Sequence, residues 1–396
     1  MAASLGAAPL ALDAAGDLAA LAPSRIVAVA RAAFARPDTV FLCFGESDQP
    51  GPPGAAAALG KALARGDARY SDVRGLPALR DALAAHLTAL HARPVEETRI
   101  QVTASGMTAV SVAFAALLRP GDRVVLHEPL WPNMANAAVL RGAVLDRVAL
   151  DQGEDGGFRL DVGRVVERLP GARVLVVNSP NNPTGWTATS EELAQLLDAC
   201  RKHGVWLVSD EVYSQLVYGG APAAPSLLDI AEPDDRVIVC NSFSKGWAMT
   251  GWRVGWAVLP RGARDRVAEI VEVVHSGVAP FVQRGAVAAL GDSAFVERFR
   301  QFCAEGRAMT EAALGGLNGV RYASPPGAFY AFLGVDGLRD SLGFALDLVE
   351  RHGVALAPGA AFGEAGEGHL RLCFAQSPAL LERALDRLRA GLRERA

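Results

Sequence analysis

The middle of the chain, from about residue 99 to 260, alternates short apolar runs with stretches of helical pattern. The apolar runs are nearly continuous, which is typical of strands that are covered on both faces of a sheet. We expect these strands at residues 99–103, 123–127, 173–177, 205–209, 237–240 and 254–258. The sequence therefore predicts the α/β fold class, with a mostly parallel sheet covered by helices.

The strongest helix signal lies at residues 189–203. Thr189 and Glu192 have the spacing of a capping box, in which two side chains bind backbone N–H groups at the start of a helix. Gly204 directly follows this stretch, and glycine commonly ends a helix. We therefore expect a helix between the third and fourth predicted strands.

The pattern changes after about residue 291, where a long amphipathic stretch at 292–317 precedes short apolar runs interleaved with helical segments. Such a succession predicts a smaller α+β domain. We expect a large domain at residues 51–290, this small domain at 291–396, and a segment at 1–50 that packs on both. The segment shows no strand pattern of its own.

Composition excludes several classes of partner. The chain has 39 Lys plus Arg against 43 Asp plus Glu, a net charge of -4, so no basic field is available for nucleic acid or an anionic membrane. The five cysteines include no CxxC pair, which favours neither a disulfide framework nor a zinc site. We therefore expect no metal, and small molecules or another subunit as partners.

The N-terminal residues argue against a secretory signal. They contain Asp13 and Asp17, and no Lys or Arg precedes Arg25, so the basic start of a signal peptide is missing. No uncharged apolar run approaches the roughly 18 residues of a membrane span. These features predict a cytoplasmic protein.

Lysine is rare in this chain, which carries only Lys61, Lys202 and Lys245 among its 39 basic residues. Arginine can replace lysine as an exposed charge, but only a lysine amine can lose its proton and form a Schiff base. Lys61 and Lys202 lie in polar segments of helical pattern, whereas Lys245 follows a predicted strand. Lys245 is therefore the candidate for covalent chemistry.

Polar clusters follow four of the predicted strands, where the open-sheet rule places ligands. They lie at residues 105–107, 178–185, 210–213 and 241–245. By itself each of the first three is compatible with an ordinary turn or helix cap. The fourth combines Ser242, Ser244 and Lys245 with Arg253 nearby, a set that fits a phosphorylated aldehyde cofactor.

Three motifs in these clusters resemble the class I/II aminotransferases, which are pyridoxal-phosphate enzymes of fold type I. The motifs are N-N-P-T-G at 181, S-D-E-V-Y at 209 and S-F-S-K-G-W-A-M-T-G-W-R-V-G at 242. The similarity extends from F-G-E-S-D at 44 through Y-S-D-V-R-G at 70 to P-G-A-A-F-G at 358 and H-L-R-L-C-F at 369. It implies an amino-acid aminotransferase with pyridoxal 5'-phosphate as cofactor.

The resemblance implies roles around the cofactor ring. Lys245 would form the Schiff base and then act as the base that moves the substrate α-proton. Asp210 would pair with the pyridine nitrogen and keep it protonated. Asn182 and Tyr213 would hydrogen-bond the phenolic oxygen, and Trp131 would stack on the ring. Lys245, Asp210 and Tyr213 are the expected catalytic residues.

The resemblance also implies a phosphate site and a shared active site. The phosphate would be bound by residues of two loops, namely Ser105, Gly106, Met107, Ser242, Ser244 and Arg253. Tyr70 matches a tyrosine that reaches the phosphate from the neighbouring subunit, which implies a homodimer. Arg371 would bind the substrate carboxylate, with Asn182 and the backbone near Gly45 completing the clamp.

One position departs from the bacterial aspartate and prephenate branch of the family. That branch has a lysine just after the phosphate-loop glycine, which helps to recognise a distal carboxylate, whereas this chain has Met107. We therefore expect neutral or aromatic amino donors rather than acidic ones. The sequence leaves open which residues form the wall of the pocket for the substrate side chain. The candidates are Phe44, Tyr70, Trp131, His275 and Phe329.

Three other functions are compatible with some of these sequence features. A β-lyase that eliminates a thiol from cysteine conjugates would use the same Lys245, Asp210 and Arg371. A non-catalytic regulator with an aminotransferase-like domain would need a DNA-binding segment, for which the chain has little room. A dinucleotide-dependent dehydrogenase would need a G-x-G-x-x-G that opens a helix after a strand, which is missing.

Overall fold

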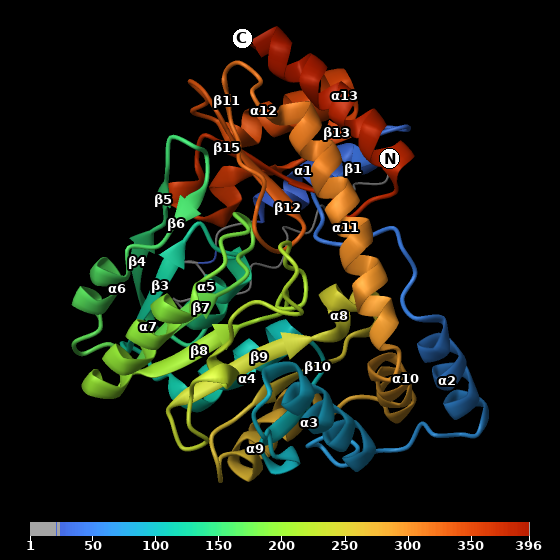
Figure 1. The fold of residues 1–396 in the computed structure, drawn as a ribbon, viewed down its shortest axis with the longest axis vertical. Helices are drawn as coiled ribbons and strands as arrows, with labels where there is room; N and C mark the ends of the chain where they lie inside the picture. Colours follow the sequence, from blue (N-terminus) through green and yellow to red (C-terminus); the bar gives the residue numbers. More distant parts are fainter. Residues whose placement is uncertain (1–20, 22–23, 396) are drawn as a thin grey trace, which may run out of the picture.

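A computed structural model of the chain describes residues 21 and 24–395, and its centre is a seven-stranded sheet (Figure 1). The strand order is β2 (Ile100–Thr103), β10 (Gly255–Val258), β9 (Val237–Ser242), β8 (Trp206–Asp210), β7 (Val174–Asn178), β3 (Arg123–Glu128) and β4 (Val144–Ala149). All pairs are parallel except those of β10 with β2 and β9. The predicted α/β class with a mostly parallel sheet is confirmed.

Helices cover both faces of this sheet because its strands bury alternate residues in two separate apolar clusters. One cluster includes α4 (Gly106–Leu117), α5 (Pro132–Val139) and α9 (Arg264–His275). The other includes α6 (Val162–Arg168) and α7 (Ser190–His203). The capping box predicted for α7 is present, with Thr189 as its N-cap. The remaining large-sheet helices, α2 (Pro53–Ala64), α3 (Pro77–His91) and α10 (Pro280–Leu290), pack together near the β2 edge.

The C-terminal part forms a second sheet of four strands. Its order is β11 (Val320–Arg321), β12 (Tyr330–Val335), β15 (His369–Cys373) and β14 (Ala357–Pro358). It is accompanied by α11 (Ser293–Leu314), α12 (Ser341–Asp347) and α13 (Pro378–Arg395), and α11 runs from beside α13 down to the level of α10 (Figure 1). Strands interleaved with helices match the α+β pattern predicted for this part.

The described part of the N-terminal segment packs on the C-terminal part of the chain. Its helix α1 (Arg25–Phe34) packs on α12 and β14, and β1 (Val40–Phe41) pairs with β13 (Val354–Ala355) in parallel. The sequence shows no strand pattern here because a two-residue strand is too short to give one. Residues 1–20 and 22–23 of the predicted segment lie outside the described residues. The domain boundaries at 50 and 290 stay a prediction.

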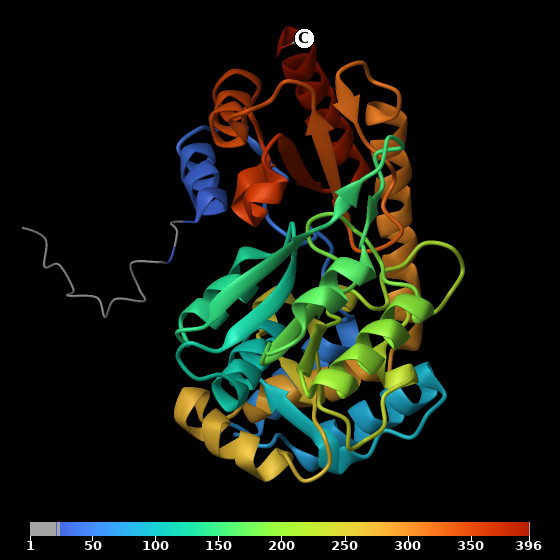
Figure 2. The same cartoon turned by 90° about the vertical axis from the view of Figure 1, so that its left-hand side faces the viewer.

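A hairpin of β5 (Asp151–Gln152) and β6 (Phe158–Arg159) extends from the large sheet toward the small one (Figure 2). Phe158 contacts Phe332 of β12 with ring centroids 5.7 Å apart. This contact ties the two parts together on the side of the β3–β4 edge.

None of the helices in the described residues combines the length and apolar character that crossing a bilayer requires. The same part of the chain contains no group of three or more His, Cys, Asp or Glu side chains that could hold a metal ion. The predicted cytoplasmic location stays a prediction.

Candidate active site

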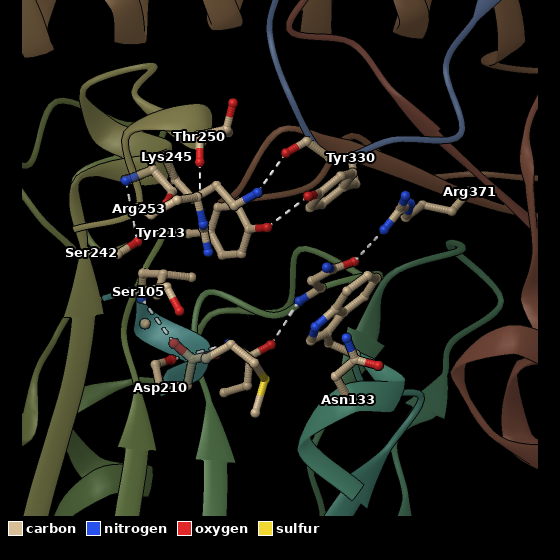
Figure 3. Close-up of a pocket in the computed structure, with 18 residues that line it drawn as sticks. Ser105, Asn133, Asp210, Tyr213, Ser242, Lys245, Thr250, Arg253, Tyr330 and Arg371 are labelled. Carbon is tan, nitrogen blue, oxygen red and sulfur yellow. Dashed lines mark hydrogen bonds between the residues drawn. The ribbon is translucent and has the colours of Figure 1, made fainter. Parts of the chain in front are cut away.

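A cavity of about 350 Å³ lies between the carboxyl ends of β7, β8 and β9 and the small sheet (Figure 3). Parallel strands deliver their following loops to one edge of a sheet, which is why polar clusters far apart in sequence meet here. Every predicted site residue except Tyr70 lines this cavity. The cavity is thus the candidate active site.

Asp210 ends β8 with its carboxylate facing the cavity and little to compensate its charge. Among the described residues its side chain accepts one hydrogen bond, from the Val212 N–H at 3.3 Å. Burial raises the pKa of Asp210 to about 7. A cation placed beside this carboxylate would restore its charged form, as a protonated pyridine nitrogen does.

The loop after β7 is fastened to the end of β8 by Asn178. The side chain of Asn178 donates to the Asp210 carbonyl at 3.1 Å and accepts from the Asn182 N–H at 2.9 Å. Asn182 in turn accepts from Arg371 through Oδ1. Its Nδ2 group therefore stays available to donate into the cavity.

Lys245 lies in the short helix α8 (Phe243–Gly246), which follows β9. Its Nζ donates to the carbonyl of Gly45 and lies 5.8 Å from the Tyr213 ring centroid and 5.7 Å from that of Phe329. Burial lowers the pKa of Lys245 to about 8, so a fraction of the amine is neutral near neutral pH. Lys61 on α2 and Lys202 on α7 are both exposed.

The N-terminus of α4 opens onto one end of the cavity. Ser105 is its N-cap and accepts from the Thr108 N–H at 2.9 Å, while the N–H groups of Gly106 and Met107 begin the helix. A Cβ on Gly106 would lie 2.8 Å from a Val212 methyl group, so only glycine fits this close approach. Free N–H groups at a helix start favour an anion.

Ser242, Ser244 and Arg253 line the same end of the cavity. Arg253 is exposed, adopts a φ of 55°, and donates to the Thr250 carbonyl. Among the described residues no carboxylate forms an ion pair with it. Two hydroxyls, a guanidinium and a helix start make up a donor set that fits a phosphate group.

Arg371 on β15 forms the opposite wall and is held before any ligand arrives. Its Nη1 donates to Asn182 Oδ1 at 2.9 Å, and its Nη2 donates to the Cys43 carbonyl. The guanidinium lies between the rings of Tyr330, at 4.4 Å, and Phe362, at 4.9 Å. Its remaining N–H donors suit a carboxylate.

Several lining residues were not singled out from the sequence, namely Asn133, Val212, Thr250 and Tyr330. Tyr330 begins β12, and an aromatic residue at the start of an apolar strand gives only a signal of burial. Of the five candidate wall residues only Trp131 lines the cavity. Phe44 and Phe329 pack outside it, because Phe329 is buried behind Tyr213 and Tyr330.

Tyr70 is the predicted site residue that the cavity does not include. It is 96 % exposed and lines a separate hollow with His275 and Pro280. In the described structure its hydroxyl does not reach the phosphate end of the cavity of its own subunit, so such a contact requires a second subunit.

A lysine, a buried carboxylate and an anion-binding helix start at the carboxyl edge of a mainly parallel sheet define an α/β enzyme of the pyridoxal-phosphate fold type I. The chain belongs to the family of class I and II aminotransferases, which it matches over residues 37–388. Members of this family use pyridoxal 5'-phosphate, and the protein is a pyridoxal-phosphate-dependent aminotransferase.

Three similar proteins show the breadth of this family. An aspartate aminotransferase of Thermotoga maritima is 33 % identical, and the match covers 90 % of this chain and 92 % of that one. An arginine–pyruvate transaminase of Pseudomonas aeruginosa is 32 % identical over 85 % of each chain. The crystal structure of an aromatic aminotransferase from Pyrococcus horikoshii has a TM-score of 0.84 and 30 % identity, covering 93 % of this chain and 99 % of that one.

Proposed function

We propose that the protein transfers the amino group of a neutral or aromatic L-amino acid to a 2-oxo acid, with Lys245 as the residue that binds the cofactor aldehyde. The observation that carries this proposal is the meeting of Lys245, Asp210 and Arg371 around one cavity. A nucleophilic amine, a carboxylate that lacks a cation, and a guanidinium for the substrate are the three charges that this chemistry needs.

Pyridoxal phosphate supplies an aldehyde that binds amines and a ring that takes up the electron pair left by the α-proton. Asp210 would hold the pyridine nitrogen in its protonated form, and Trp131 would pack on the ring. Asn182 and Tyr213 would donate to the phenolic oxygen. The phosphate would be bound by the loop residues Ser105, Gly106, Met107, Ser242, Ser244 and Arg253.

Lys245 performs two tasks in this proposal. Its neutral amine, which donates to the Gly45 carbonyl here, would bind the cofactor aldehyde. With the substrate amine bound there instead, the same nitrogen would accept the proton of the substrate Cα. Arg371 and the backbone at Gly45 hold the substrate carboxylate, so that the Cα–H bond faces Lys245.

The preference for neutral or aromatic donors rests on Met107, whose side chain lines the cavity where the aspartate and prephenate branch has a lysine. An uncharged thioether offers a distal carboxylate no ion pair, whereas it packs well on apolar and aromatic groups. The similar proteins bear names with acidic, basic and aromatic substrates, so the names do not narrow the choice.

A homodimer completes the phosphate site in this proposal. Tyr70 is exposed at 96 %, which is unusual for so large an aromatic residue, and Val273 is exposed at 88 % on α9. An interface over this face would bury both, and would allow Tyr70 of one subunit to reach the phosphate bound by the other.

A single-turnover titration tests the function. The cofactor-loaded protein is mixed with one amino acid at a time without any 2-oxo acid, while the visible absorption and the products are followed. Loss of the visible absorption band of the lysine-bound cofactor, with one equivalent of 2-oxo acid formed per active site, establishes transamination and identifies the donor. Continuous release of pyruvate and ammonia with a persisting band would instead identify a β-lyase.

Aspartate serves as the comparison donor in the same titration. We expect phenylalanine or leucine to react at least about 10-fold faster than aspartate, because an unpaired distal carboxylate must be desolvated. Equal rates with aspartate would contradict the proposed preference without affecting the assignment of Lys245.

A further inference from the structure

Tyr330 lines the cavity, and its hydroxyl points toward Tyr213 from a place between Lys245 and Arg371 (Figure 3). It is fully buried, and its oxygen lies 2.6 Å from the Tyr213 oxygen. This is the only hydrogen bond that either hydroxyl makes within the described residues. The two hydroxyls thus have no hydrogen-bond partner but each other in the described part of the chain.

We propose that Tyr330 is a positioning residue that donates its proton to Tyr213 and thereby directs the Tyr213 proton onto the phenolic oxygen of the cofactor. The inference rests on the proposed role of Tyr213. The direction of the shared hydrogen bond follows from the number of protons on the two hydroxyls. Burial raises the pKa of both tyrosines, so each hydroxyl keeps its single proton.

Two hydroxyls in contact have two protons, of which one lies in their shared hydrogen bond. The other is free for a third acceptor. When Tyr213 donates to the cofactor oxygen, the shared bond can only be donated by Tyr330. A phenol that accepts a hydrogen bond is polarised and donates more strongly, so Tyr330 strengthens the bond that Tyr213 makes.

The surroundings of Tyr330 fix its oxygen in this place. Any Cβ at position 45 would clash with the Tyr330 hydroxyl, so a glycine is required there. The other side of the ring is occupied by the Arg371 guanidinium, 4.4 Å from the centroid. This cation disfavours a proton of Tyr330 that points toward it and favours one that points toward Tyr213.

The test compares Tyr330→Phe, which keeps the ring and removes the hydroxyl, with the matched control Tyr218→Phe. Tyr218 donates a hydrogen bond of the same length, 2.6 Å, to the Ala328 carbonyl and also lies beside an arginine, Arg307, but it does not line the cavity. Each variant loses one hydroxyl, so we expect the melting temperatures of the two apo-proteins to fall by similar amounts.

The decisive readout is the pH titration of the visible absorption of the lysine-bound cofactor. The Tyr213 hydrogen bond and the proton on the lysine nitrogen compete for the same phenolic oxygen, so a weaker Tyr213 bond raises the pKa of this linkage. We expect a rise of about 0.3 pKa units in Tyr330→Phe, and about 1 unit in Tyr213→Phe. Tyr218→Phe should titrate like the wild type.

An unchanged titration of Tyr330→Phe, together with a raised KM for the amino donor, would overturn the inference. That result would mean that Tyr213 donates to Tyr330 and that the free proton of Tyr330 points at the substrate. A wild-type protein that acquires no visible band with pyridoxal phosphate would instead contradict the proposed function itself. The two failures are thus distinguishable.

Discussion

The two walls of the cavity hold their charged groups in opposite ways. On the sheet wall, defined by Asp210, Lys245 and Arg253, the charged atoms have few partners in the protein. On the clamp wall, defined by Arg371 and Tyr330, the guanidinium already has two hydrogen bonds and lies between two rings. The sheet wall thus leaves its charges available for a charged cofactor. The clamp wall already holds its guanidinium in a fixed position for the substrate.

This difference has an energetic consequence. A buried carboxylate without a cation and a buried amine without an anion both favour their neutral forms, which is why their pKa values move in opposite directions. The sheet wall therefore costs stability until the cofactor binds. The Arg371 guanidinium is paired within the chain, so a substitution of Arg371 should act mainly on the substrate.

Lys245→Ala is the strongest way to break the sheet wall. We expect loss of the visible band and at least a roughly 10³-fold loss of turnover, because the variant loses both the attachment point and the proton carrier. The controls Lys61→Ala and Lys202→Ala change exposed lysines and should stay within about twofold of the wild type. A full band in Lys245→Ala would contradict the assignment.

Asp210→Asn should separate stability from function. The raised pKa of Asp210 means that the folded apo-protein binds this proton more tightly than the unfolded chain. The free energy of unfolding therefore falls as the pH rises from about 4 to about 7. At pH 8 the asparagine removes this cost, and the melting temperature of the apo-protein should rise by about 2 °C. Turnover should fall about 10³-fold, because the pyridine nitrogen loses its partner.

Asp235→Asn is the matched control, for which we expect the opposite change in melting temperature. The Arg201 guanidinium lowers the pKa of Asp235, so its charged form is favoured in the folded state. Removing that charge should lower the melting temperature at pH 8 and leave turnover unchanged. Calorimetry of the two apo-proteins would show whether the cost at Asp210 is real.

Arg371→Lys tests the clamp wall. Lysine keeps the charge but loses the planar fork that pairs with a carboxylate, so kcat/KM for amino donors should fall about 100-fold. The visible band should persist, since the cofactor contacts are on the other wall. Arg387→Lys is the control, because Arg387 donates to the Asp38 and Gly353 carbonyls outside the cavity. A lost band in Arg371→Lys would erase the distinction between the walls.

The pH dependence of cofactor binding tests whether the pKa of Lys245 on the sheet wall is lowered. Only the neutral amine attacks the aldehyde, and with a pKa of about 8 the neutral fraction of Lys245 rises roughly tenfold from pH 7 to pH 9. The rate of band formation in the apo-protein should follow this rise and level off. A rate that still climbs steeply at pH 10 would indicate an ordinary lysine.

Met107→Lys is expected to have the smallest effect. Met107 is partly exposed, so a cation at this position could pair with a distal carboxylate for about 1 kcal/mol, which is about fivefold in kcat/KM for aspartate. Met107→Leu is the control for packing alone and should leave the preference unchanged. An equal gain in both variants would mean that charge at this position is not the determinant.

The two walls also differ in how far the sequence predicts them. The sheet wall follows from local signals, because each polar cluster comes directly after an apolar strand and parallel topology brings the clusters together. The ends of the predicted strands were placed within two residues, as for the strand expected at 237–240, which is β9 (Val237–Ser242). The edge strand β4 was missed because Asp146 and Arg147 interrupt its apolar run.

The clamp wall depends on contacts between distant residues. Tyr213 and Tyr330 are 117 positions apart, and their hydrogen bond leaves no local pattern. Arg371 was found through the resemblance, since the chain has many arginines and none is marked by its neighbours alone. The role of Tyr70 in a neighbouring subunit was likewise assigned through the resemblance, because no local pattern shows which surface a second subunit covers.

The scarcity of lysine has a practical side for handling this enzyme. Lys61 on α2 and Lys202 on α7 are the exposed lysines of the described residues, and both lie on helices away from the cavity. Amine-reactive dyes or resins would therefore couple at few places, chiefly at these two helices. If the cofactor is bound to Lys245 as proposed, the protein can be immobilised in a small number of orientations with this lysine protected.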